Sequence, residues 1–145
     1  FTDPPLCKDK IAQDRFVVLA RKNHPALKNG LDLETFLRLG HINVSQRKSG
    51  AGPIDIALDK MGKRRKEVMR GQHFLTVPST IVKTDLIACL PFHLAKHYDL
   101  AIYEVPFDLP PVEYFLYWHV SADHDYAHMW MREQIMEVAS TFKPH

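Results

Sequence analysis

Short apolar runs alternate with amphipathic segments along most of this chain. The run Phe16–Ala20 has apolar side chains at consecutive positions, which is typical of a strand covered on both faces. Apolar runs of similar length predict further strands at residues 42–45, 66–70, 85–90, 100–105 and 112–119. Helical spacing of apolar positions predicts helices at residues 32–39, 53–61, 76–83 and 92–98, and a long terminal helix to about residue 141.

Helix start and stop signals are clear at several of these boundaries. Asp32 is a candidate N-cap, Pro53 suits the first turn of its helix, and Gly62 ends that helix. For the terminal helix, either Asp123 or Asp125 is the expected N-cap. Strands and helices that alternate in this way predict an α/β fold with a mainly parallel sheet flanked by helices.

The length and net charge of the chain limit the classes of protein to which it can belong. The chain has 145 residues, which suits one domain, and its net charge of +2 gives little support to direct binding of nucleic acid. No apolar run approaches the roughly 18 residues of a membrane span, so we expect a soluble protein with no membrane partner. Cys7 and Cys89 lack a CxxC spacing, so free thiols and a cytoplasmic location are expected. Because the chain begins at Phe1, we expect a piece of a longer protein.

Two polar loops form the candidate ligand site. The loop at residues 45–52 leaves a strand and enters the helix at Pro53, and the loop at residues 72–77 enters the next helix in the same way. Ligands of parallel α/β sheets bind beyond the carboxyl ends of the strands, where helix N-termini favour negative charge. The side chains suited to bind a small anionic ligand are Ser45, Gln46, Ser49, His73, Phe74 and Thr76. The alternative is that these are ordinary turn and cap residues.

Enzyme and metal chemistry find little support. His119, His124 and His128 lie within ten positions, but no HExxH motif is present and the neighbouring aspartates are expected helix caps. The chain has no GxSxG elbow and no glycine-rich phosphate loop. We therefore expect no metal, no cofactor, no catalytic residue and no enzymatic activity. The basic cluster at residues 60–66 is expected to be solvated charge at the end of a helix.

Four segments occur in an order that resembles the effector-binding domain of LysR-type transcriptional regulators, in the branch that responds to aromatic acids and flavonoid-like inducers. These segments are residues 14–25, 74–78 and 84–91, and the group Trp118, His119, Asp125, Ala127, His128, Trp130 and Arg132. The resemblance spans essentially the whole chain but matches only the later part of the family's domain. It implies a periplasmic-binding-protein-like fold with one complete Rossmann-like subdomain and a remnant of the other.

The same resemblance implies a domain organisation. Residues 23–112 would form the second effector subdomain, while residues 1–22 and 113–145 would be the remnant of the first together with the crossing strands. The crossing strands would be Phe16–Ala20 and Tyr114–His119. The family's N-terminal winged helix-turn-helix has no counterpart in these residues, so promoter DNA would be bound only through that absent part.

The function implied is that of a cytoplasmic, DNA-binding transcription regulator whose effector domain binds a small aromatic or carboxylate inducer between its subdomains. The implied effector-binding residues are Ser45, Gln46, His73, Phe74, Val77 and Pro78, with Tyr117 or Trp118 as the floor and His41 as a further candidate. A structural role is the alternative for His41. The alternative functions are a stand-alone solute-binding protein of a transport system and a histidine-based metalloenzyme.

Apolar side chains of the last strand and the terminal helix are expected to be exposed in such a remnant. They include Phe115, Trp130 and Met131. Exposed apolar patches of this kind seldom persist without a partner. We therefore expect a homo-oligomer in which another copy of the chain covers them.

Overall fold

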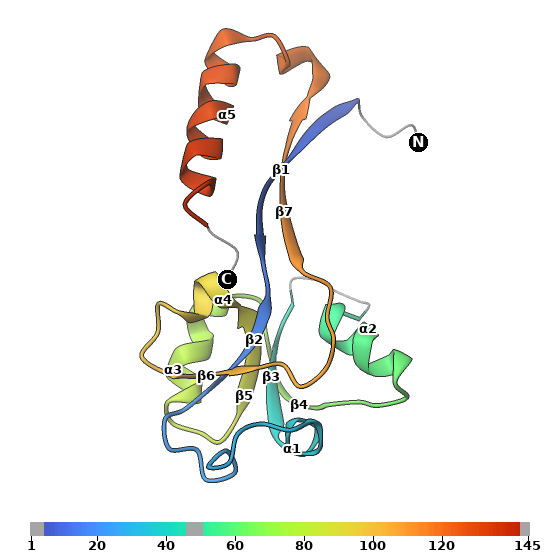
Figure 1. The fold of residues 1–145 in the computed structure, drawn as a ribbon, viewed down its shortest axis with the longest axis vertical. Helices are drawn as coiled ribbons and strands as arrows, with labels where there is room; N and C mark the ends of the chain where they lie inside the picture. The colour runs from blue at the N-terminus through green and yellow to red at the C-terminus, as the bar shows by residue number, and fades with distance from the viewer. Residues whose placement is uncertain (1–4, 46–50, 143–145) are drawn as a thin grey trace. The chain divides into compact units, whose positions relative to one another are not determined.

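The computed structural model describes residues 5–45 and 51–142, which fall into two compact units (Figure 1). One unit comprises residues 15–110, and the other comprises residues 1–14 and 111–145. The boundary near the start of the chain therefore lies before Arg15, ahead of the position between residues 22 and 23 that the resemblance implied.

The larger unit is built on a five-stranded sheet in the order β4-β3-β5-β2-β6. Its strands are β2 (Phe16–Ala20), β3 (Gly40–Val44), β4 (Lys66–Gly71), β5 (Ile87–Pro91) and β6 (Ala101–Glu104). Strand β3 runs parallel to β4 and β5, whereas β2 runs antiparallel to β5 and β6. Four strands of this sheet thus share one direction and β2 is reversed, so the α/β prediction with a mainly parallel sheet is confirmed.

Helices cover both faces of this sheet (Figure 1). They are α1 (Leu33–Arg38), α2 (Pro53–Lys60), the 3₁₀ turn η1 (Phe74–Thr76), α3 (Val77–Ile81) and α4 (Phe92–Ala95). The predicted N-cap of α1 is confirmed, because Asp32 accepts a hydrogen bond from the backbone N–H of Thr35 at 2.7 Å. Pro53 occupies the first turn of α2, as the sequence predicts.

Strand β2 accounts for the two hydrophobic layers of the unit. Val17 and Leu19 pack on one face of the sheet with residues of α3 and α4, and Val18 and Ala20 pack on the other with residues of α1 and α2. All four side chains are fully buried. Because both faces are covered, the strand has no polar alternation in its sequence.

The expectation that Phe16–Ala20 is a crossing strand is wrong, because β2 pairs with β5 and β6 inside the five-stranded sheet. The strand that pairs with β7 (Val112–His119) is β1 (Leu6–Asp14), which the sequence did not predict. Five of the nine positions of β1 are polar, and its apolar residues do not alternate with them. A strand held mainly by its backbone ladder leaves no apolar pattern to detect.

The smaller unit consists of the antiparallel β1–β7 pair, the 3₁₀ turn η2 (Val120–Ala122) and helix α5 (Tyr126–Ala139). The side chain of Asp125 accepts a hydrogen bond from the backbone N–H of His128 at 2.8 Å, so Asp125 is the N-cap of α5. None of the helices in the described residues is long and apolar enough to cross a membrane.

Candidate functional site

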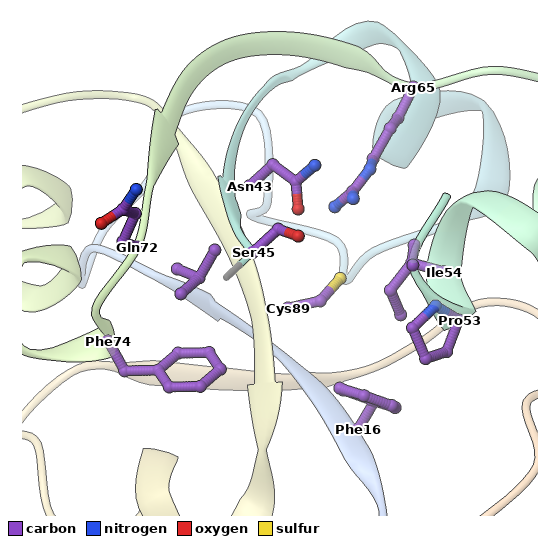
Figure 2. Close-up of a pocket in the computed structure, with 11 residues that line it drawn as sticks. Phe16, Asn43, Ser45, Pro53, Ile54, Arg65, Gln72, Phe74 and Cys89 are labelled. Atoms are coloured by element: carbon purple, nitrogen blue, oxygen red, sulfur yellow. The ribbon is translucent and has the colours of Figure 1, made fainter. Parts of the chain in front are cut away.

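A cavity of about 370 Å³ opens at the edge of the five-stranded sheet where β3 and β4 end (Figure 2). It lies wholly within the larger unit. Its lining residues among those described are Phe16, Asn43, Val44, Ser45, Gly52, Pro53, Ile54, Arg65, Gln72, Phe74 and Cys89. This is the edge at which parallel α/β sheets place their ligands.

Strand direction brings distant residues together at this edge. Ser45 follows the end of β3, and Gln72 follows the end of β4. The backbone N–H of Ser45 donates to the carbonyl of Gly71 at 2.9 Å, which joins the two loops. Because β2 is reversed, its first residue, Phe16, also lies at this edge.

The start of helix α2 forms one wall of the cavity. Gly52 is the N-cap and offers no side-chain oxygen to the first turn of the helix. The positive end of the helix dipole and its backbone N–H groups favour an anion here. Figure 2 shows Pro53 and Ile54 on one side of the cavity and Phe74 on the opposite side. The site thus combines apolar walls with a few polar groups, which suits a small organic molecule.

A side-chain network orients Asn43 at the cavity. Its Nδ2 donates to Oε2 of Glu67 at 2.6 Å. Arg70 donates to both carboxylate oxygens of Glu67, from Nε at 2.9 Å and from Nη2 at 3.1 Å. The Arg70 hydrogen bond, assisted by that of Asn43, holds the pKa of the Glu67 carboxyl below its usual range. Asn43 therefore presents its amide in one orientation.

The basic residues at 60–66 were expected to be solvated, but Arg65 is not. Its side chain is only 4% exposed and lines the cavity, whereas that of Arg64 is 91% exposed. The cause is the turn after α2, where Gly62 has a φ of +66° and Lys63 donates to the carbonyl of Leu58 at 2.9 Å. This turn reverses the chain and carries Arg65 back toward the start of the helix.

Cys89 lies in β5 and contributes a thiol to the cavity. Burial raises the pKa of this thiol to about 12. Because the thiolate is the nucleophilic form, a thiol with this pKa is a packing group and not a nucleophile.

The residues predicted from the sequence to bind the effector lie in different parts of the structure. Ser45 and Phe74 line the cavity, while Gln46 and Ser49 lie outside the described residues. His73 is exposed between the lining residues Gln72 and Phe74 but is not itself part of the lining. Pro78 is half-buried in the first turn of α3 and also does not line the cavity.

Two of the selected residues belong to the core and not to the cavity. Val77 is buried and packs in the hydrophobic layer between the sheet and α3. His41 is fully buried at the start of β3, away from the edge where that strand ends. Its Nε2 lies 2.6 Å from the carbonyl oxygen of Phe36, and its ring contacts that of Phe36 edge-on at 4.5 Å. The structural alternative for His41 is therefore the one that its surroundings support.

Trp118 lies in the smaller unit and holds the turn between β7 and α5. Its Nε1 donates to Oδ1 of Asp123 at 2.9 Å, and the guanidinium of Arg132 lies over its ring at 4.4 Å. Arg132 also donates to the carbonyls of Ala122 and Asp123. Within the part of the chain that the structure describes, no three His, Cys, Asp or Glu side chains are grouped as metal ligands.

Several lining residues are not predicted from the sequence, among them Phe16, Asn43, Ile54, Arg65 and Cys89. Phe16, Ile54 and Cys89 lie in apolar segments that predict a strand or a helix face and nothing more. Asn43 carried a usable signal, because a polar side chain in a short strand that precedes a candidate loop marks the end of the strand. Arg65 carried no such signal in the sequence, because the direction of its side chain depends on the turn after α2.

Comparison with known proteins identifies the family of this chain. The family model for the LysR substrate binding domain matches residues 1–140. The HTH-type transcriptional activator NahR of Pseudomonas putida is 30% identical over 133 residues, which are 89% of this chain and 44% of NahR. The chain thus spans less than half the length of this relative.

Solved structures agree with the sequence comparison. The probable transcriptional regulator PA0477 from Pseudomonas aeruginosa superposes with a TM-score of 0.81 at 32% identity, over 93% of this chain and 45% of that one. The effector binding domain of QuiR in complex with shikimate superposes with a TM-score of 0.75 at 14% identity, over 97% of this chain and 68% of that one. The latter likeness is one of fold.

Proposed function

Because the chain belongs to the LysR substrate-binding domain family, we propose that it senses a small-molecule effector for a transcription regulator that binds DNA elsewhere in the same protein. The domain is a LysR-type effector-binding domain with a periplasmic-binding-protein-like fold. The similarity to PA0477, a probable transcriptional regulator, and to the activator NahR favours a regulator over a transport solute-binding protein. Such a regulator acts where the chromosome lies, in the cytoplasm, and without catalysis.

The cavity at the ends of β3 and β4 is the observation that carries this proposal. Its volume of about 370 Å³ suits a molecule of one aromatic ring with a short substituent. Phe16, Phe74 and Ile54 supply apolar surface, and Ser45 and Gln72 supply hydrogen-bonding groups. The start of α2 favours a carboxylate over a cation. A small aromatic carboxylate is therefore the effector class that we propose.

Binding in this cavity regulates transcription only if the effector distinguishes two states of the protein. A ligand shifts an equilibrium by the difference between its affinities for the two states, and by nothing else. In this proposal the effector favours one arrangement of an oligomer whose DNA-binding parts contact the promoter. The relative NahR is named as an activator.

Isothermal titration calorimetry with benzoate, cinnamate and phenylacetate tests the binding step. We expect at least one of these acids to bind, and Phe74→Ala to weaken that binding by about tenfold or more because the ring loses its apolar contact. Leu75→Ala is the matched control, since the neighbouring Leu75 is 81% exposed and does not line the cavity.

A reporter gene under the regulated promoter tests the second step. The acid that binds should change transcription, and Phe74→Ala should shift the response to higher acid concentrations. Absence of binding by all three acids, or equal affinities in the Phe74→Ala and Leu75→Ala variants, would rule out this cavity as the site for aromatic acids.

A further inference from the structure

Arg65 is the only charged side chain among the described residues that line the cavity. Its Nε and Nη2 donate to Oδ1 and Oδ2 of Asp55, at 2.7 and 2.8 Å. Asp55 lies in the first turn of α2. Two parallel hydrogen bonds to one carboxylate fix the plane of a guanidinium as well as its position.

Asp55 engages two of the three nitrogens of this guanidinium. Nη1 of Arg65 makes no hydrogen bond with any described residue, although the side chain is 96% buried, being 4% exposed. Figure 2 shows the side chain reaching from the rim of the cavity toward Asn43. Because Asp55 accepts from Nε and Nη2, Nη1 is the nitrogen that can donate to an acceptor inside the cavity.

The charged side chains near the cavity are paired with one another. The Asp55 carboxylate is bound by Arg65, and the Glu67 carboxylate is bound by Arg70 and Asn43. No described lining residue is acidic. The uncapped first turn of α2 adds its partial positive charge to the same side of the cavity. Although Asp55 offsets the charge of Arg65, Nη1 and the first turn of α2 present N–H donors on a side of the cavity where no described lining residue is acidic, and such donors suit the oxygens of an acid.

We propose that Arg65 is the residue that selects an acid over a neutral effector, by donating from Nη1 to the effector's carboxylate. Asp55 is a positioning residue, which holds the guanidinium plane while Nη1 faces the cavity. This inference rests on the proposed function and names the group in the cavity that recognises the acid. Arg65 and Asp55 both lie in the unit of residues 15–110.

Paired probes of equal shape test the role of Arg65. The dissociation constants of benzoate, cinnamate and phenylacetate are measured by calorimetry in the purified protein, each next to that of its uncharged amide. In the unmodified protein we expect the acid to bind about tenfold to hundredfold more tightly than its amide, as a charged hydrogen bond provides. In Arg65→Gln the ratio should fall toward one. A general structural disturbance would weaken acid and amide alike and leave the ratio in place.

Two further variants keep the test decisive. Arg64→Gln removes the adjacent, exposed arginine and should leave the acid-to-amide ratio unchanged. If Arg65→Gln does not fold, Arg65→Lys keeps a positive charge beside Asp55 but lacks the planar fork, and the ratio should still fall severalfold.

The outcomes separate this inference from the function on which it rests. If no acid or amide binds, the proposed function fails and the role of Arg65 fails with it. If acids bind but no more tightly than their amides, or if the folded Arg65 variants keep the ratio of the unmodified protein, only the role of Arg65 is overturned.

Discussion

At the scale of single residues, the burial of His41 makes the stability of the fold depend on pH. The pKa of His41 is lowered from an ordinary value of 6.5 to about 4, because burial and, to a smaller extent, the charge of Arg65 outweigh the hydrogen bond with Phe36 and the charge of Asp55, which raise it. The unfolded chain therefore binds a proton near pH 6.5 and the folded chain does not. The free energy of unfolding should fall by up to about 3 kcal/mol as the pH decreases from 6.5 to 4, with no further loss from this residue below pH 4.

Urea unfolding at pH 7, 5.5 and 4.5 measures this dependence. His41→Gln removes the titrating ring but keeps an N–H that can reach the carbonyl of Phe36. Its stability should be lower at pH 7 and should depend less steeply on pH below 6.5. An unchanged slope in this variant would show that other groups cause the acid sensitivity.

Cys89 supports a second prediction at this scale. Because the pKa of its thiol is raised to about 12, roughly one in ten thousand of these thiols is ionised at pH 8. In a Cys7→Ser variant, which leaves Cys89 as the one thiol, alkylation by iodoacetamide at pH 8 should be very slow in the folded protein. It should become fast in 8 M urea. Fast reaction of the folded protein would mean that Cys89 is accessible and ionised.

At the scale of elements, the turn that ends α2 controls where Arg65 lies. Gly62 donates to the carbonyl of Asp59 at 3.0 Å and Lys63 donates to that of Leu58 at 2.9 Å, which is the Schellman pattern. The pattern needs a left-handed residue, and Gly62 has a φ of +66°. Gly62→Ala should therefore lower the free energy of unfolding by about 1 kcal/mol.

The same variant should weaken binding of an aromatic acid, because the chain from residue 63 to Arg65 loses its fixed direction. Denaturant titration and calorimetry measure the two effects. Gly62→Asn is the matched control, since asparagine tolerates the left-handed conformation better than alanine and should lose less of both. Equal losses in the two variants would contradict a role for the left-handed backbone.

At the scale of the whole molecule, helix α5 leaves a large apolar surface in solvent. Trp130 is 59% exposed, and Met131 and Val138 are also exposed. Surfaces of this kind are uncommon in monomers. We predict that the protein self-associates through this face, and that Trp130→Glu shifts it toward the monomer.

Size-exclusion chromatography with light scattering over a range of concentrations measures this association. Glu133→Gln is the control, because it changes an exposed polar side chain on the same helix. A strictly monomeric protein at high concentration would contradict the prediction. Equal masses for the Trp130 variant and the unmodified oligomer would place the contact elsewhere.

Local signals predicted much of the fold of residues 15–110. The caps at Asp32 and Gly62 and the buried run of β2 depend on residues close together in the chain, and each appears where the sequence places it. Strand β1 was missed for the opposite reason. Its partner β7 lies about a hundred residues away, and its own apolar residues do not alternate with polar ones.

The candidate site was predictable only in part. The rule that ligands bind beyond the carboxyl ends of strands identified the loops after β3 and β4, and with them Ser45 and Phe74. Val77 and His41 were predicted to bind the effector because of their positions in the chain. Whether their side chains face a cavity or the core depends on which elements pack against them. Both side chains turn into the core.

The sequence alone determined the strands and helices of residues 15–110, the α/β class and the family, because these follow from short-range patterns and from the order of motifs. Only the tertiary structure decided that β2 runs against its neighbours and that Arg65 faces a cavity while Arg64 faces solvent. Two adjacent arginines are equivalent in a sequence. Their environments differ because a turn and a carboxylate ten positions earlier, at Asp55, hold one of them in the interior.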